Sequence, residues 1–313
     1  MSHSLRLGID LGGTTAKVGV VDERAQVLHA ISVPTPMDFS QAADAMAAAV
    51  HEVAALSGCT VQDFPFAGAG VPSMINPRTG RMVFANNTGW HDAPMREALE
   101  QRLGIPVHLA NDADCALLAE AQAGAAQGAD HALMITLGTG VGSAIILNGH
   151  LFTGGDGMGM EAGHLPLVAG GYPCTCGARG CLEAYASATG LAALAREELQ
   201  QVQHSALHAP DAKLTGRTIF AAANQGDAAA IRIIDRYCAL LAQGLGGLIT
   251  VFRPQVVIVG GGISHAGAPL FDRLHTLVPQ FVFAHEQIGT PDIRPAALGN
   301  EAGIVGAAFL DRA

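Results

Sequence analysis

The sequence predicts an α/β protein that contains a duplicated α/β domain. Strand-like and helix-like segments alternate along its 313 residues. Two strand pairs, residues 5–9 with 16–21 and residues 132–136 with 143–147, are each joined by a glycine-rich turn. Each turn leads into a second strand and not into a helix, so neither matches a dinucleotide-binding fingerprint, and a Gly-Lys-Ser/Thr phosphate loop is absent from the sequence.

The other elements follow in chain order. The first half continues with a helix, two short buried strands and a second helix, over residues 40–57, 66–71, 107–110 and 111–122. The second half is mostly helical before one buried strand and a closing helix, over residues 187–250, 256–259 and 299–310. We expect a first domain of residues 1–115, completed by the C-terminal helix at 299–313, and a second domain of residues 116–298.

Composition limits the class of partner. Half of the residues are apolar and the formal net charge is −10, so the chain can bury a large core but lacks the basic surface that nucleic acids or anionic membranes need. The longest apolar stretch, residues 237–252, is interrupted by polar residues and glycines and is too short to span a bilayer. Unpaired cysteines fit a reducing compartment, and we expect a cytoplasmic protein.

Four potential metal ligands lie close together in the sequence: His164, Cys174, Cys176 and Cys181. One imidazole and three thiolates are donors that tetrahedral zinc prefers, and four protein ligands make a closed, structural site. The alternative is a loop of buried or disulfide-paired cysteines. Carboxylates flank the segment on both sides, at Glu161 and Glu183, which suggests that the zinc loop presents polar groups to a small polyol.

The glycine-rich turns suit the binding of nucleotide phosphates. Glycines let backbone N–H groups approach phosphate oxygens without interference from a Cβ atom, and neighbouring threonines add hydroxyl donors. The alternative is that the glycines only form tight hairpins. A third glycine cluster follows the buried strand at 256–259 and favours the phosphate reading. The expected nucleotide ligands are Asp10, Gly12, Gly13, Thr14, Thr15, Lys17, Gly138, Thr139, Gly140, Gly261 and Gly262.

Asn111 and Asp112 mark the point where an apolar strand ends and a helix begins, which is where open α/β sheets place ligands. Phosphoryl transfer to a hydroxyl needs a carboxylate that orients the nucleophile and accepts its proton. Helix capping explains the pair equally well, and Asp114 could also serve as the cap.

These motifs together resemble a known family. Asp10-Leu-Gly-Gly-Thr14 and Leu137-Gly-Thr-Gly-Val-Gly142 resemble the two phosphate motifs of the superfamily of sugar kinases and actin. The segment from Glu161-Ala-Gly-His164 through the three cysteines to Glu183 is similar to the signature of the ROK family (repressors, open reading frames, kinases), especially its bacterial glucokinases. The resemblance extends from Leu5 to Leu310.

The resemblance implies a duplicated actin-like, hexokinase-type ATPase fold, with two lobes around a cleft and a zinc-binding loop. It implies ATP-dependent phosphorylation of a hexose, glucose above all, at the 6-hydroxyl, with Asp112 as general base. Asp10 would position Mg²⁺, and the protein would be a homodimer. His164 would bind zinc through one ring nitrogen and a sugar hydroxyl through the other. The implied sugar ligands are Asn86, Asn111, Asp112, Glu161, His164 and Glu183.

Alternatives remain for the substrate and for the class of function. Thr88 stands where the family has proline, Ser73 where glycine is frequent and Asp114 where asparagine is common, so N-acetylmannosamine, fructose, mannose or allose could replace glucose. A sugar-sensing ROK regulator would carry an N-terminal helix-turn-helix, for which a first strand at Leu5 leaves no room. A zinc-ribbon interaction module would leave both glycine turns and Asp112 unexplained.

Overall fold

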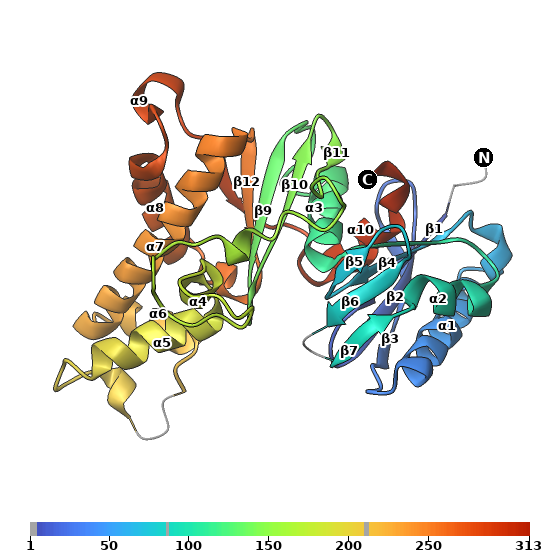
Figure 1. Cartoon of the computed structure of the whole chain (residues 1–313), viewed down its shortest axis with the longest axis horizontal. Coiled ribbons are helices and arrows are strands. Elements are labelled where there is room, and N and C mark those ends of the chain that lie inside the picture. The colour runs from blue at the N-terminus through green and yellow to red at the C-terminus, as the bar shows by residue number, and fades with distance from the viewer. Residues whose placement is uncertain (1–4, 86–87, 210–212) are drawn as a thin grey trace. The chain divides into compact units, whose positions relative to one another are not determined.

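The computed structural model describes residues 5–85, 88–209 and 213–313 (Figure 1). The chain forms two compact units. The first contains residues 1–130, 144–160 and 297–313, and the second contains residues 131–143 and 161–296. The domain boundary expected near residue 115 stays a prediction.

The structure contains two five-stranded sheets, with strand orders β3-β2-β1-β4-β8 and β11-β10-β9-β12-β13. When the five strands of each sheet are counted along the chain, both sheets have the order 3-2-1-4-5. The strands of the first sheet are β1 Arg6–Leu11, β2 Thr15–Val21, β3 Val27–Pro34, β4 Ala67–Val71 and β8 Val107–Asn111. Those of the second sheet are β9 Ala132–Leu137, β10 Val141–Leu147, β11 His150–Leu151, β12 Val256–Gly260 and β13 Asp292–Pro295. The repeated order confirms the predicted duplication.

Strand direction places the candidate residues at one edge of each sheet. In the first sheet, β1 pairs antiparallel with β2 and parallel with β4, and β4 pairs parallel with β8. In the second sheet, β12 runs parallel to both β9 and β13. The carboxyl ends of parallel strands lie at the same sheet edge, where open α/β folds bind ligands.

Helices cover both faces of the first sheet (Figure 1). α1 (Phe39–Leu56) and α2 (Met95–Leu103) lie on one face, and α3 (Asp112–Ala123) and α10 (Ala302–Ala308) on the other. A small sheet of β5 Met74–Asn76, β6 Arg81–Ala85 and β7 Trp90–Ala93 completes the unit.

Glycines in the strands allow α10 to approach the first sheet closely. A Cβ atom at Gly8 of β1 would lie 2.0 Å from the carbonyl oxygen of Ile304, and one at Gly68 of β4 would lie 1.7 Å from that of Ala307. Any side chain at either position would therefore push the helix away from the sheet. This contact explains why strands that otherwise read as apolar contain glycine.

The second unit contains most of the helices. They are α4 Glu183–Ala186, α5 Ala188–Leu199, α6 Gly216–Asn224, α7 Ala228–Phe252, α8 Ala268–Leu277 and α9 His285–Ile288. Short 3₁₀ turns occur in both units: η1 Val61–Asp63, η2 Ala162–His164, η3 Ala206–His208, η4 Gly262–Ala266, η5 Val278–Phe281, η6 Gly299–Glu301 and η7 Leu310–Arg312. Among the described residues, no helix is both long and apolar enough to cross a membrane.

The closing helix is shorter than the sequence suggested. The expected helix at 299–310 is interrupted, with the 3₁₀ turns η6 and η7 on either side of α10. Gly299 has φ of +54°, which allows the chain to turn into η6 before α10 begins.

Glu120 of α3 is a fully buried carboxylate that sequence reasoning did not single out. Its Oε1 accepts the N–H groups of Ala297 and Leu298 at 2.8 and 2.9 Å, and its Oε2 accepts that of Ala125 at 2.7 Å. These bonds hold the segment that leads into α10 against the end of α3. Buried charges are tolerated where hydrogen bonds of this kind satisfy them.

We expect Glu120→Gln to lower the melting temperature. An amide presents an N–H group on one side, so one set of buried backbone donors loses its acceptor, at a cost of about 1–3 kcal/mol. Differential scanning calorimetry measures the change, with Glu52→Gln at an exposed site of α1 as the matched control. Equal melting temperatures for the two variants would contradict the structural role of Glu120.

Candidate active site

The first glycine turn connects β1 to β2 at the carboxyl end of β1. The N–H of Gly12 donates to the carbonyl of Thr15 at 3.0 Å, and the hydroxyl of Thr35, at the start of the loop after β3, donates to the carbonyl of Gly12 at 2.9 Å. A Cβ atom at Gly12 would lie 2.8 Å from that Thr15 oxygen. These hydrogen bonds fix the backbone of the turn, while Thr14 and Thr15 remain exposed to solvent.

Asp10 and Lys17 form a pair beside this turn. Nζ of Lys17 lies 3.9 Å from Oδ2 of Asp10 and donates to the carbonyl of Asn300 at 3.1 Å. Burial raises the pKa of the Asp10 carboxyl, and the Lys17 ammonium lowers it in part. A half-buried carboxylate at a strand end is a suitable partner for Mg²⁺, directly or through water.

Asn111 and Asp112 lie at the carboxyl end of β8, on the same sheet edge as the first turn. Asn111 is the N-cap of α3, and its Oδ1 accepts the N–H of Ala113 at 2.8 Å. Asp112 is the first residue of the helix and is exposed, whereas Asp114 is buried. Oδ1 of Asp112 also accepts the N–H of Ala113, at 2.8 Å, so both side chains contribute to the cap of α3.

The second glycine turn connects β9 to β10 in the second unit. The N–H of Gly138 donates to the carbonyl of Gly140 at 3.0 Å. The third glycine cluster lies beside it, because Gly260 is paired with Thr136 and a Cβ atom at Gly261 would lie 2.5 Å from the backbone of Leu137. Gly261 has φ of +82°, which glycine adopts at little cost. Thr139, Gly261 and Gly262 are exposed, so both clusters present backbone to solvent at this sheet edge.

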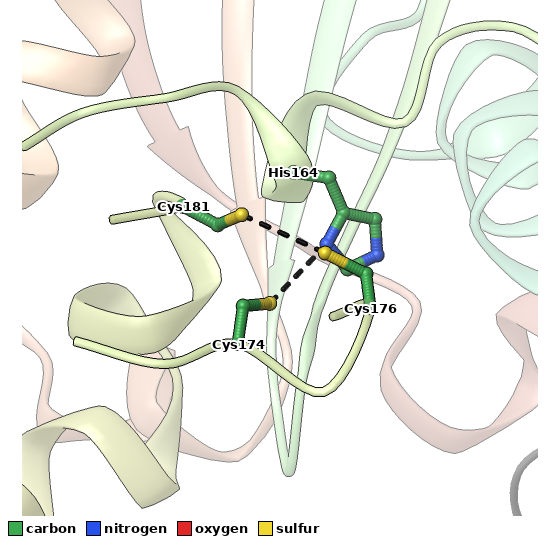
Figure 2. Close-up of side chains that lie close together, drawn as sticks. All are labelled: His164, Cys174, Cys176 and Cys181. Carbon is green, nitrogen blue, oxygen red and sulfur yellow. Dashed lines mark hydrogen bonds between the residues drawn. The ribbon is translucent and has the colours of Figure 1, made fainter. Parts of the chain in front are cut away.

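The predicted metal ligands gather in the second unit. Figure 2 shows the side chains of His164, Cys174, Cys176 and Cys181 converging, and their ligand atoms all lie within 4.8 Å of one another. The tight turn after Cys174, in which the N–H of Gly177 donates to the Cys174 carbonyl, brings the first two thiols together. The backbone bridge between Pro166 and Cys181 adds the third.

The distances within the cluster fit one zinc ion. Two sulfurs bound tetrahedrally at about 2.3 Å lie about 3.8 Å apart, and a sulfur and a nitrogen about 3.6 Å apart. Sγ of Cys176 lies 3.7 Å from Sγ of Cys181, and Sγ of Cys174 lies 3.6 Å from Nδ1 of His164. A disulfide would need about 2.05 Å, so the cysteines are free. Desolvation raises the pKa of Cys181 to about 12, and a bound cation would supply the charge that holds it as a thiolate.

The segment Glu161–His164 packs against the start of β10. The N–H of Ala162 donates to the hydroxyl of Ser143 at 2.8 Å, and a Cβ atom at Gly163 would lie 2.3 Å from the carbonyl oxygen of Val141. His164 directs Nδ1 to the metal cluster, which leaves Nε2 for another partner (Figure 2). Desolvation raises the pKa of the Glu161 carboxyl, and the neighbouring Glu183 carboxylate raises it further, although His164 lowers it in part.

Glu183 connects the metal loop to the second glycine turn. Its Oε2 accepts the N–H of Val141 at 3.0 Å, and its Oε1 accepts the hydroxyl of Thr175 at 2.9 Å. The carboxylate therefore lies between the predicted zinc ligands and the backbone that follows Gly140.

Comparison with known proteins identifies the relatives of this arrangement. The model of the ROK family matches residues 6–313, which is nearly the whole chain. The chain belongs to the ROK family. Among its relatives, the glucokinase of Thermotoga maritima is 37% identical over 309 residues, which cover 97% of this chain and 96% of the relative. The N-acetyl-D-glucosamine kinase of Pasteurella multocida is 32% identical over 322 residues, which cover 98% of this chain and 99% of that kinase.

A solved ROK structure shares the fold. The ROK glucokinase of Streptomyces griseus, in complex with glucose and AMPPNP, matches with a TM-score of 0.82 and 35% identity. The match covers 98% of both chains. The duplicated actin-like fold that the sequence suggested is therefore confirmed.

One predicted site residue cannot be located, and three residues with a role in the site were not predicted from the sequence. Asn86, expected to contact the sugar in ROK kinases, lies outside the described residues. Thr175, Val141 and Ser143 were not expected to take part, yet they hold Glu183 and the segment at 161–164 in place. Thr175 lies between two cysteines that were predicted to bind zinc, which was the only sequence signal for its role.

Proposed function

We propose that the protein transfers the γ-phosphoryl group of ATP to the 6-hydroxyl of glucose. The observation that carries this proposal is the exposed Asp112 carboxylate, at the carboxyl edge of the sheet that also holds the first glycine turn. Full-length similarity to glucokinases supports the choice of reaction and substrate.

Each element then has a chemical task. Asp112 orients the sugar hydroxyl and accepts its proton as the bond to phosphorus forms. The backbone N–H groups of the glycine turns bind the ATP phosphates, with the hydroxyls of Thr14 and Thr139 as further donors. Asp10 would hold Mg²⁺, directly or through water, and the ion would neutralise charge on the phosphates. Lys17, beside Asp10, adds a positive charge next to the first turn.

The sugar is bound by amide, carboxylate and imidazole groups. We assign Asn86, Asn111, Asp112, Glu161, His164 and Glu183 to its hydroxyls. His164 and the three cysteines would hold zinc, which would fix the tautomer and orientation of the His164 ring, so that Nε2 could bond a sugar hydroxyl. We also propose that the protein is a cytoplasmic homodimer. Analytical ultracentrifugation tests the oligomeric state.

N-acetyl-D-glucosamine is the second candidate substrate. Relatives named as kinases for that sugar cover nearly the whole chain at 32–34% identity, close to the values for the glucokinases. The two sugars differ at the 2-position, so a few contacts near one substituent decide between them.

A coupled assay of ADP release with a panel of sugars tests the proposal. We expect the highest kcat/KM with glucose, and lower values with N-acetyl-D-glucosamine, N-acetylmannosamine, mannose, fructose and allose. A preference for another hexose would change the assigned substrate but would still support the assigned kinase reaction. ADP release that no sugar stimulates would contradict the kinase assignment and favour a sugar-sensing regulator.

A further inference from the structure

The contacts of Glu183 have a consequence for nucleotide binding. Its Oε2 holds the N–H of Val141, which directly follows the second glycine turn, while its Oε1 holds the hydroxyl of Thr175, which lies between two zinc ligands. Oε1 also lies 3.6 Å from Sγ of Cys174. A single carboxylate thus joins the metal loop to the turn through hydrogen bonds.

Each of the three residues of the turn, Gly138 to Gly140, contacts the segment that begins at Glu183. A Cβ atom at Gly140 would lie 2.5 Å from Oε2 of Glu183, so only glycine leaves room for it. The N–H of Ala188 donates to the carbonyl of Gly138 at 2.8 Å, and the hydroxyl of Thr189 donates to that of Thr139 at 3.3 Å. All of these partners belong to residues 183–189, directly after the last zinc ligand.

We propose that Thr175 and Glu183 are positioning residues through which the zinc loop fixes the second phosphate-binding turn. Zinc held by the cysteines on either side of Thr175 would immobilise this loop, Thr175 orients Glu183, and Glu183 holds the backbone next to Gly140. The inference rests on the proposed function, since it takes the turn to bind ATP.

The same residues surround a common cavity. Thr139, Thr175 and Glu183 all line a pocket of about 530 Å³ beside the turn. A shift of Glu183 therefore changes the turn and the space next to it together. A carboxylate has about four lone-pair sites, so Glu183 can hold Val141 and Thr175 and still accept a sugar hydroxyl.

Thr175→Val tests the inference, because it removes the hydroxyl and keeps the shape of the side chain. Thr175→Ser restores the hydroxyl and is the matched control. Titration calorimetry of the zinc-containing proteins with Mg²⁺-AMPPNP measures the dissociation constant, and elemental analysis measures the zinc content. We expect Thr175→Val to bind the analogue about three- to tenfold more weakly, as loss of one hydrogen bond implies, with one zinc per chain retained. Thr175→Ser should bind within twofold of wild type.

The KM values for ATP and glucose add a second readout. We expect the KM for ATP to rise with the dissociation constant, and the KM for glucose to change less. Unchanged AMPPNP binding by Thr175→Val would overturn the inference, as would a rise in the KM for glucose alone or a loss of zinc. Wild-type protein that does not bind AMPPNP would instead overturn the proposed function itself.

Discussion

Replacing Asp112 by asparagine is expected to reduce kcat by about 10²–10⁴-fold, the usual contribution of a general base. Glucose binding should persist, because an amide still hydrogen-bonds to a hydroxyl. The fold should persist as well, since Asn111 still accepts the N–H of Ala113 and the amide oxygen of an asparagine at 112 can accept it as Asp112 does. Steady-state kinetics and glucose titration calorimetry measure the two effects separately.

Asp114→Asn is the matched control for this change. It makes the same substitution two residues later, at a position where asparagine is common in the ROK family, so kcat should stay within a few-fold of wild type. A loss of less than about tenfold in Asp112→Asn would remove the general-base assignment. A large loss in Asp114→Asn alone would transfer the role to that residue.

Loss of zinc is expected to have the second largest effect. Elemental analysis should find one zinc per chain, and Cys176→Ala should lose both the metal and thermal stability. The site forms only in the folded protein, so the binding free energy contributes to folding; in isolated zinc-finger peptides it reaches about 10–16 kcal/mol. Calorimetric melting curves measure the stability lost.

Cys59→Ala is the control for the metal experiment, since Cys59 lies outside the cluster. This variant should keep one zinc per chain and a melting temperature near that of wild type. Wild-type protein that is free of metal yet folds and phosphorylates glucose normally would contradict the structural role of zinc.

Local sequence patterns predicted much of the fold. The two strand–glycine turn–strand units and the strands 107–110 and 256–259 appear in the structure within a few residues of the expected bounds. These segments are buried in the sheets, so their apolar runs are strong signals. The metal cluster was also predictable, because all four ligands lie in one short stretch of sequence.

The parts that were missed depend on contacts between distant residues. β3 is an edge strand with mostly exposed or half-buried residues, and β5–β7 are three to five residues long, so neither has a clear periodic pattern. Glu120 lies on the buried face of α3 and bonds to residues near 297, far along the chain. A charged residue in an apolar helix stripe was a signal, but the sequence could not identify its partners.

Product analysis tests the central claim most directly. Purified protein is incubated with ATP, Mg²⁺ and glucose, and the products are identified by phosphorus NMR and mass spectrometry. The structure and its relatives predict glucose 6-phosphate and ADP in equal amounts, with neither formed when glucose is left out. Phosphate attached at the anomeric hydroxyl, or ADP formed without any phosphorylated sugar, would contradict the assignment of this protein as an ATP-dependent glucose 6-kinase.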